Sequence, residues 1–201
     1  MTTSLNRRLF LAGTMTALML PASAAIASPP DESEDWGVFS KLAGVFVAIQ
    51  AATQPIADGI TRLKFVRFLN GIQGPLTDIL REKNAVLDAL EIGTCTTDAR
   101  TVEAMASRPA QRIIPLVTVL QQKVATLSTA IKPGDTRQAA TQLANEMSRL
   151  QSRKMWVHQL NGFCGRPPAD RAAFVARVKQ SIAIVQEAQK KLDALLDHLT
   201  E

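Results

Sequence analysis

This chain of 201 residues lacks several features that mark common protein classes. Tyrosine is absent and aromatic residues make up only 4%, which disfavours an aromatic-rich β-sandwich or a surface that stacks on nucleic-acid bases. Ten glycines, ten prolines and two cysteines exclude a collagen-like repeat and a disulfide-dense miniprotein. Apolar residues make up 46% and charged residues 20%, so we expect a packed globular protein rather than a disordered chain.

Recognisable catalytic and metal-binding motifs are also missing. The two histidines, His158 and His198, form neither H-x-x-x-H nor H-E-x-x-H, and the chain contains no G-x-S-x-G and no C-x-x-C. We therefore expect neither a metal ion nor another cofactor. A haem held by Met105, Met147 or Met155 together with His158 is a weaker alternative, because a methionine at helical spacing is more often a core residue.

The first 27 residues have the organisation of a cleaved export signal. Arg7 and Arg8 precede a moderately apolar run from Leu9 to Leu20, which is too short to span a bilayer. Small residues follow, and they place a cleavage site after Ala24 or, as we favour, after Ala27. The mature protein then begins with an acidic, flexible lead over residues 28–35, followed by one helical domain over residues 36–201.

The stretch Arg7-Arg8-Leu9-Phe10-Leu11 resembles the core of a twin-arginine signal. Asn6 and Ala12 depart from the residues that are usual at the flanking positions, so the general secretory route stays open. The resemblance implies that the protein crosses the membrane already folded. By either route we expect a periplasmic or secreted bacterial protein.

Removing the signal lowers the formal charge from +5 to +3, because Arg7 and Arg8 are lost and no acid is lost with them. So mild an excess is not typical of a nucleic-acid-binding domain. No later run approaches about 18 consecutive apolar residues, so we do not expect the mature chain to span a membrane.

Apolar residues of the mature chain recur at helical spacing, and strand-like alternation is nearly absent. The pattern predicts helices over 36–53, 56–70, 75–92, 113–131, 135–160 and 167–199. A further short helical piece begins at Thr97 or Asp98 and is broken by Pro109. The last four long helices predict an all-α, up-down-up-down helical bundle, and the first two helices form an additional N-terminal pair.

Cys95 and Cys164 are the only cysteines, and in an oxidising compartment they most simply form one disulfide. Gly93 and Gly162 lie two residues before them and are typical of helix C-terminal caps. The bond would therefore tie together the ends of two parallel helices, in agreement with up-down-up connectivity. A redox or metal role for the two cysteines is the less expected alternative.

A basic cluster is the most distinctive local feature of the sequence, and it comprises Arg149, Arg153, Lys154, Trp156, His158 and Arg166. Arg149, Arg153 and Trp156 share one helix face, and arginine and tryptophan often anchor interfaces. Such a surface would bind an anionic lipid headgroup, an acidic cell-wall polymer or an envelope protein. The plainer interpretation is a solvated face, because cations are favoured near a helix C-terminus.

The first predicted helix is apolar over most of its circumference, and Phe65 and Phe68 extend this character into the second. A helix of this kind has to be buried, either inside its own bundle or by a partner. A central helix of the bundle is the plainer expectation. A homodimer interface and a groove for an apolar ligand are the alternatives.

Non-enzymatic binding or a structural role in the bacterial envelope fits these observations best, because helical stripes explain most residues. We interpret the acidic residues as parts of solvated helix faces rather than as catalytic carboxylates, namely Glu82, Asp88, Glu91, Glu103 and Glu146. A carrier of an apolar small molecule or lipid is the first alternative, and an enzyme without a recognisable motif is the second.

Overall fold

The computed structural model describes residues 34–92, 95, 98–152 and 159–201. Its elements are α1 (Glu34–Ala51), α2 (Arg62–Ile92), α3 (Ala99–Ala130), α4 (Asp135–Ser152), the short 3-10 helix η1 (Phe163–Gly165) and α6 (Pro168–Thr200). The predicted export signal and most of the acidic lead lie outside the described residues. The described part of the chain confirms the prediction of an all-α bundle.

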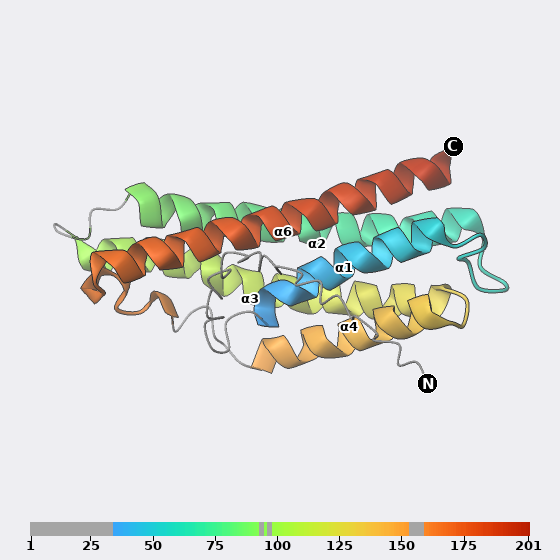
Figure 1. Ribbon diagram of the computed structural model, residues 1–201, viewed down its shortest axis with the longest axis horizontal. Helices are drawn as coiled ribbons and strands as arrows, with labels where there is room; N and C mark the ends of the chain where they lie inside the picture. Colours follow the sequence, from blue (N-terminus) through green and yellow to red (C-terminus); the bar gives the residue numbers. More distant parts are fainter. Residues whose placement is uncertain (1–33, 93–94, 96–97, 153–158) are drawn as a thin grey trace, which may run out of the picture.

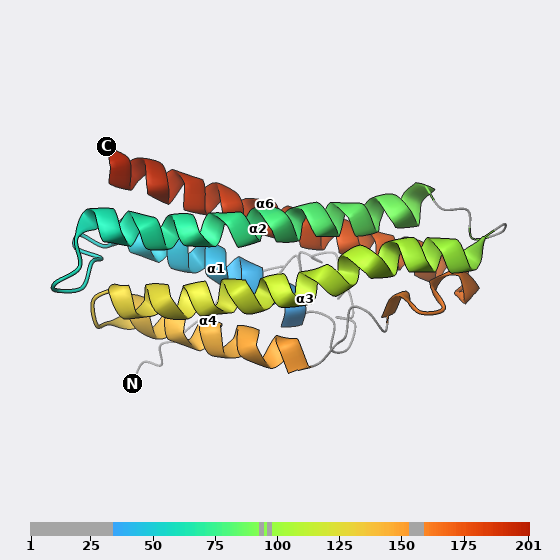
Figure 2. The same ribbon diagram turned by 180° about the vertical axis from the view of Figure 1, so that it is seen from behind.

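Three long helices set the length of the bundle. α2, α3 and α6 contain 31, 32 and 33 residues, whereas α1 and α4 contain 18 each and lie along one half of the long helices (Figures 1 and 2). In that half, α1 packs against α6 and α4, α2 packs against α6 and α3, and α3 packs against α4, which closes a five-helix ring. α2, α3, α4 and α6 alternate in direction, as predicted (Figure 1).

The predicted breaks at Pro75 and Pro109 are wrong. α2 continues through Pro75, and α3 continues through both Pro109 and Pro115 and bends along its length (Figure 2). A proline inside a helix removes one backbone hydrogen bond. The apolar stripe nevertheless continues on both sides of Pro75, where Ile72 and Leu76 are fully buried. Packing therefore outweighs the local cost, and the second member of the expected N-terminal pair is the first half of α2.

The buried apolar side chains form two clusters. The larger cluster lies in the half of the bundle where all five helices meet, and it includes Phe46, Phe65 and Leu120. The smaller cluster lies between the other halves of α2, α3 and α6, and it includes Phe163 from η1 and Phe174 from α6. The two half-length helices therefore cover only one of the two cores.

α1 is buried by its neighbours inside the bundle. Phe39 and Phe46 are at most 4% exposed, whereas Val47 on the outer side is 45% exposed. Phe65 of α2 is buried in the same core, and Phe68 packs against it in part. α6 and α4 cover the inner, apolar side of α1, whereas Lys41, Gly44 and Val47 on its outer side stay exposed, so α1 is a member of the ring and not the expected central helix.

Two loops are joined at the end of the bundle that carries the C-terminus (Figure 1). Ile56 and Ile131 form an isolated antiparallel bridge, and the Ala57 N–H donates to the Ala130 carbonyl at 2.8 Å. Arg137 Nε donates to the Ile131 carbonyl at 2.6 Å, which satisfies a carbonyl at the end of α3. This pairing holds the residues before α2 in a loop, so α2 begins later than the predicted second helix.

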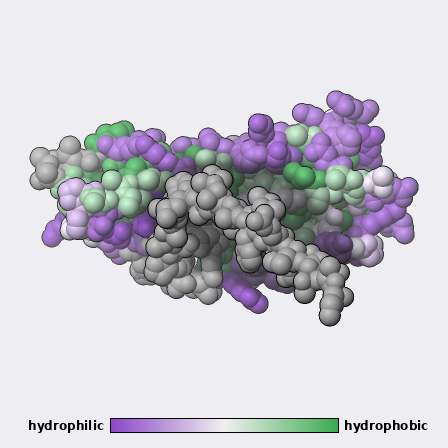
Figure 3. Space-filling view, viewed as in Figure 1, coloured by the Kyte–Doolittle hydropathy of each residue, from purple (hydrophilic) through white to green (hydrophobic). Residues whose placement is uncertain are grey.

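Hydrophilic side chains follow much of α6 in the view of Figure 1, and hydrophobic side chains show as small separate patches (Figure 3). The exposed large hydrophobic residues of the described part are Val47, Leu63, Ile92, Met105 and Val119. Among the described helices, none combines the length and the hydropathy that crossing a membrane requires.

Candidate functional site

The structure describes two members of the predicted basic cluster. Arg149 is exposed in the last turn of α4, and Arg166 follows η1. The other four members, Arg153, Lys154, Trp156 and His158, lie outside the residues whose side chains are described. That the six residues form one binding surface therefore remains a prediction from the sequence.

Arg166 makes two contacts within the chain. One guanidinium nitrogen donates to the Gln159 carbonyl at 2.5 Å, and the guanidinium carbon lies 5.5 Å from the centre of the Phe174 ring. Arg177 approaches the same ring at 5.6 Å, and Phe163 packs against it at 5.7 Å. A cation over an aromatic face is attracted by the ring quadrupole. Arg166 thus helps to hold the start of α6 against η1.

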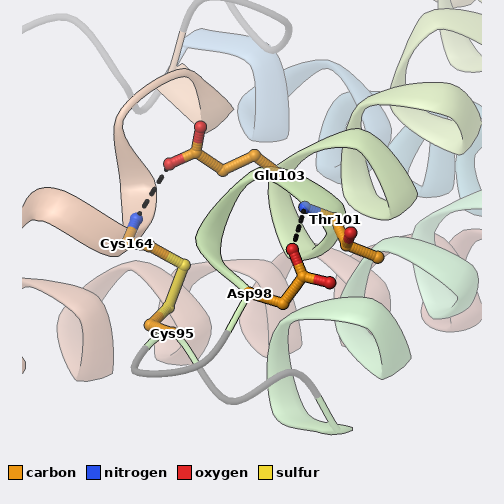
Figure 4. Close-up of a disulfide and its surroundings, with 5 residues drawn as sticks. All are labelled: Cys95, Asp98, Thr101, Glu103 and Cys164. Carbon is orange, nitrogen blue, oxygen red and sulfur yellow. Dashed lines mark hydrogen bonds between the residues drawn. A yellow bond between two sulfur atoms is a disulfide. The ribbon is translucent and has the colours of Figure 1, made fainter.

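The Cys95–Cys164 disulfide is confirmed (Figure 4). It joins the connection between α2 and α3 to η1, with the two Cα atoms 5.0 Å apart. Glu103 of α3 accepts a hydrogen bond from the Cys164 N–H at 3.1 Å, so this carboxylate braces the disulfide and is not simply solvated. Asp98 caps α3 by accepting from the Thr101 N–H at 3.3 Å.

A buried polar layer, formed by Glu82, Lys83 and Ser181, separates the two apolar cores. Glu82 is 5% exposed, and Lys83 and Ser181 are each 1% exposed. On α2 the layer lies between Ile79 of the larger cluster and Val86 of the smaller one. Burying a polar or charged group costs free energy unless the group forms hydrogen bonds or ion pairs. The contacts of these three side chains therefore determine whether the layer stabilises the bundle.

Lys83 and Ser181 form a pair across α2 and α6. The Lys83 ammonium donates to Ser181 Oγ and lies 5.7 Å from the centre of the Phe39 ring of α1. A serine beside a lysine can serve as a nucleophile with its base in some hydrolases. Here both residues are almost fully buried, so a dissolved substrate does not reach them in this conformation. Their present contacts join three helices.

Glu82 lies on the side of the layer that faces α3. Its carboxylate is 3.4 Å from a guanidinium nitrogen of Arg81 and 3.6 Å from one of Arg112, and its side chain is 7% exposed. The expectation that Glu82 belongs to a solvated face is therefore wrong. Because the arginine side chains are about two-thirds exposed, solvent weakens both ion pairs.

The sequence carries a signal for this layer that the spacing of apolar residues alone does not reveal. Lys83 occupies a position of the α2 stripe, four residues after Ile79 and three before Val86. Ser181 occupies a position of the apolar stripe of α6, three residues after Val178 and four before Val185. Its side chain is polar and smaller than the valines on either side. A polar residue inside an otherwise apolar helical stripe indicates a buried polar contact.

The structure places Met105 and Met147, two of the residues considered for haem binding, on different helices. Met147 is buried in α4, whereas Met105 is 54% exposed on α3, and Met155 and His158 lie outside the described residues. Within the described ranges, no group of three or more His, Cys, Asp and Glu side chains is placed to hold a metal ion.

A shallow groove of about 300 Å³ runs between α1 and α4. Small side chains line it, among them Gly44 and Ala48 of α1 and Ala139 of α4. An ion pair between Lys41 and Glu146, 2.7 Å apart, crosses between the same two helices. Glu146 is therefore half-buried and paired across the helix interface.

Compared with family models, with curated proteins and with solved structures, the chain matches none of them. Inferences about function therefore come from its own residues.

Proposed function

We propose that the protein is exported to the bacterial envelope and acts there by binding, in a structural or interaction role that involves no catalysis. The observation that carries the proposal is the pairing of its only two cysteines in one disulfide. Disulfides persist in the periplasm and outside the cell, and they are rare in the cytosol. The Arg7-Arg8 export signal in the sequence supports the same compartment.

The arrangement of polar residues supports binding rather than catalysis. Lys83, Ser181, Glu82 and Glu103 all have contacts that join helices or brace the disulfide. The Cys95–Cys164 bond ties the bundle at one end, and the paired loops tie it at the other. Such an arrangement suits a scaffold that holds a binding surface in place. The surface that the sequence favours for contact is the basic cluster.

Export is tested by expressing the full chain in a bacterial host and measuring the intact mass of the protein in the periplasmic fraction. We expect the mass of residues 28–201 less two hydrogens. An R7K/R8K variant blocks a twin-arginine route and leaves general secretion able to operate, so it separates the two routes. An uncleaved, reduced protein confined to the cytosol would contradict the proposal.

Binding is tested by charge reversal at Arg149, Arg153 and Lys154. We expect the triple variant to lose cross-linking to its envelope partner while its melting temperature is unchanged. A matched variant reverses Lys64, Arg67 and Lys190, which are exposed elsewhere, and it should retain the cross-link. Equal cross-linking by both variants would show that the cluster is not the binding surface.

A further inference from the structure

The outer face of α3 carries a stripe in which cationic and apolar side chains mix. The stripe consists of Met105, Arg108, Arg112, Pro115, Val119 and Lys123, all exposed and spaced by three or four residues. Residues at this spacing lie on one side of a helix. At a rise of 1.5 Å per residue, the stripe is about 27 Å long. In Figure 2, α3 lies on the near side of the bundle, between α2 and α4.

The stripe presents positive charge without exposed negative charge on its own helix. Glu103 is the only acid in α3, and it accepts a hydrogen bond from the Cys164 N–H. The carboxylate that meets Arg112 belongs to Glu82, whose side chain is 7% exposed, whereas that of Arg112 is 68% exposed. Arg108 and Lys123 have exposed side chains on either side of it along the helix.

The apolar members of the stripe are exposed as well. Met105 is 54% exposed and Val119 is 39% exposed, and they lie outside both apolar clusters of the bundle. A soluble polyanion would bind the cationic side chains and leave Met105 and Val119 in contact with water. An anionic lipid surface would use both, because cations meet the headgroups while apolar side chains enter the boundary with the acyl chains.

We propose that the α3 stripe is a docking surface for an anionic lipid bilayer. The inference rests on the proposed function, because it names the chemistry of one binding partner in the envelope.

The test is partitioning of the mature protein, residues 28–201 with its disulfide intact, onto vesicles. Vesicles of phosphatidylglycerol and phosphatidylcholine are compared with vesicles of phosphatidylcholine alone, at low and at physiological salt. We expect binding only to the anionic vesicles, and weaker binding as the salt concentration rises.

Two variants separate the contributions of charge and apolar contact. R108Q/K123Q keeps the Arg112–Glu82 pair and should lower the partition coefficient about 25-fold, at about fivefold for each charge. M105S/V119S keeps every charge and should lower the partition coefficient about fivefold. K64Q/K190Q is the matched control for R108Q/K123Q, since it removes two exposed cations elsewhere and should change partitioning less than twofold.

The outcomes distinguish the lipid surface from other partners. If M105S/V119S binds like the unchanged protein, or if K64Q/K190Q loses as much as R108Q/K123Q, the stripe is not a lipid-docking surface. If the unchanged protein fails to bind anionic vesicles but still cross-links its envelope partner through the basic cluster, the lipid inference is overturned and the proposed function stands. Loss of both binding activities overturns both.

Discussion

Lys83 keeps its ammonium group in the interior of the bundle by exchanging water for protein contacts. The group donates to Ser181 Oγ and faces the Phe39 ring, so α2 is linked to α6 and to α1 at the same level. An apolar side chain at this position would fit several registers of the helices against each other. A buried polar contact is satisfied in few of them, and we infer that Lys83 and Ser181 fix the register.

Replacing one member of this pair should cost more than replacing both. In S181A the buried ammonium loses an acceptor, and we expect the free energy of unfolding to fall by about 1–3 kcal/mol. In K83M/S181A the buried ammonium and its serine acceptor are both removed, so we expect the double variant to recover much of that loss. Urea unfolding followed by circular dichroism measures both. A double variant less stable than S181A would show that the lysine stabilises the core on its own.

At the scale of the helices, the sequence predicted where apolar stripes run better than where helices end. The stripes in α1, α4 and α6 were found because their buried residues recur at three and four positions. The breaks predicted at Pro75 and Pro109 are wrong, because the packing on both sides of each proline outweighs the loss of one backbone hydrogen bond. Pro75 lies between buried Ile72 and Leu76, and that burial is a property of the folded bundle.

α1 depends on its inner face for its place in the bundle, and two adjacent residues test this. Phe46 is fully buried, and F46A should lower the free energy of unfolding by about 3–5 kcal/mol through lost contacts and a cavity. Val47 is 45% exposed, and V47A should change it by less than about 0.5 kcal/mol. Thermal unfolding of both variants provides the measurement. Similar losses in the two would mean that Val47 is covered by a partner or a second copy in solution.

At the scale of the whole molecule, the two cysteines predict one long-range contact correctly. The charged residues do not predict the long-range ion pairs that they form. Two cysteines allow a single pairing within the chain, so the Cys95–Cys164 bond is predicted without coordinates. Glu82 was misplaced because its burial depends on α3, whose Arg112 approaches it from a distant part of the sequence. The α3 stripe was missed for a related reason, since only the packed bundle shows which face of α3 stays exposed.

Removing the disulfide should lower the stability of the whole bundle. The paired cysteines are 69 residues apart, and closing a loop of that length is worth about 4 kcal/mol in the chain-entropy model. We expect C95S/C164S to lose about that amount in urea unfolding while its far-ultraviolet circular dichroism stays helical. A loss below about 1 kcal/mol would indicate that the reduced, unfolded chain already keeps the two segments close together.

The same bond determines what a single cut by a protease would do to this molecule. Cys95 and Cys164 enclose the exposed turn at Pro133 and Gly134, whereas the exposed turn at Asp58 and Gly59 lies outside the enclosed segment. A nick at the enclosed turn leaves both pieces in one covalent molecule, which separates only after reduction. A nick at the outer turn frees the segment that contains α1 from every covalent attachment, so packing alone retains it. A single cut at Pro133 and Gly134 therefore leaves the molecule covalently connected. A single cut at Asp58 and Gly59 releases α1 once its packing against the other helices is lost.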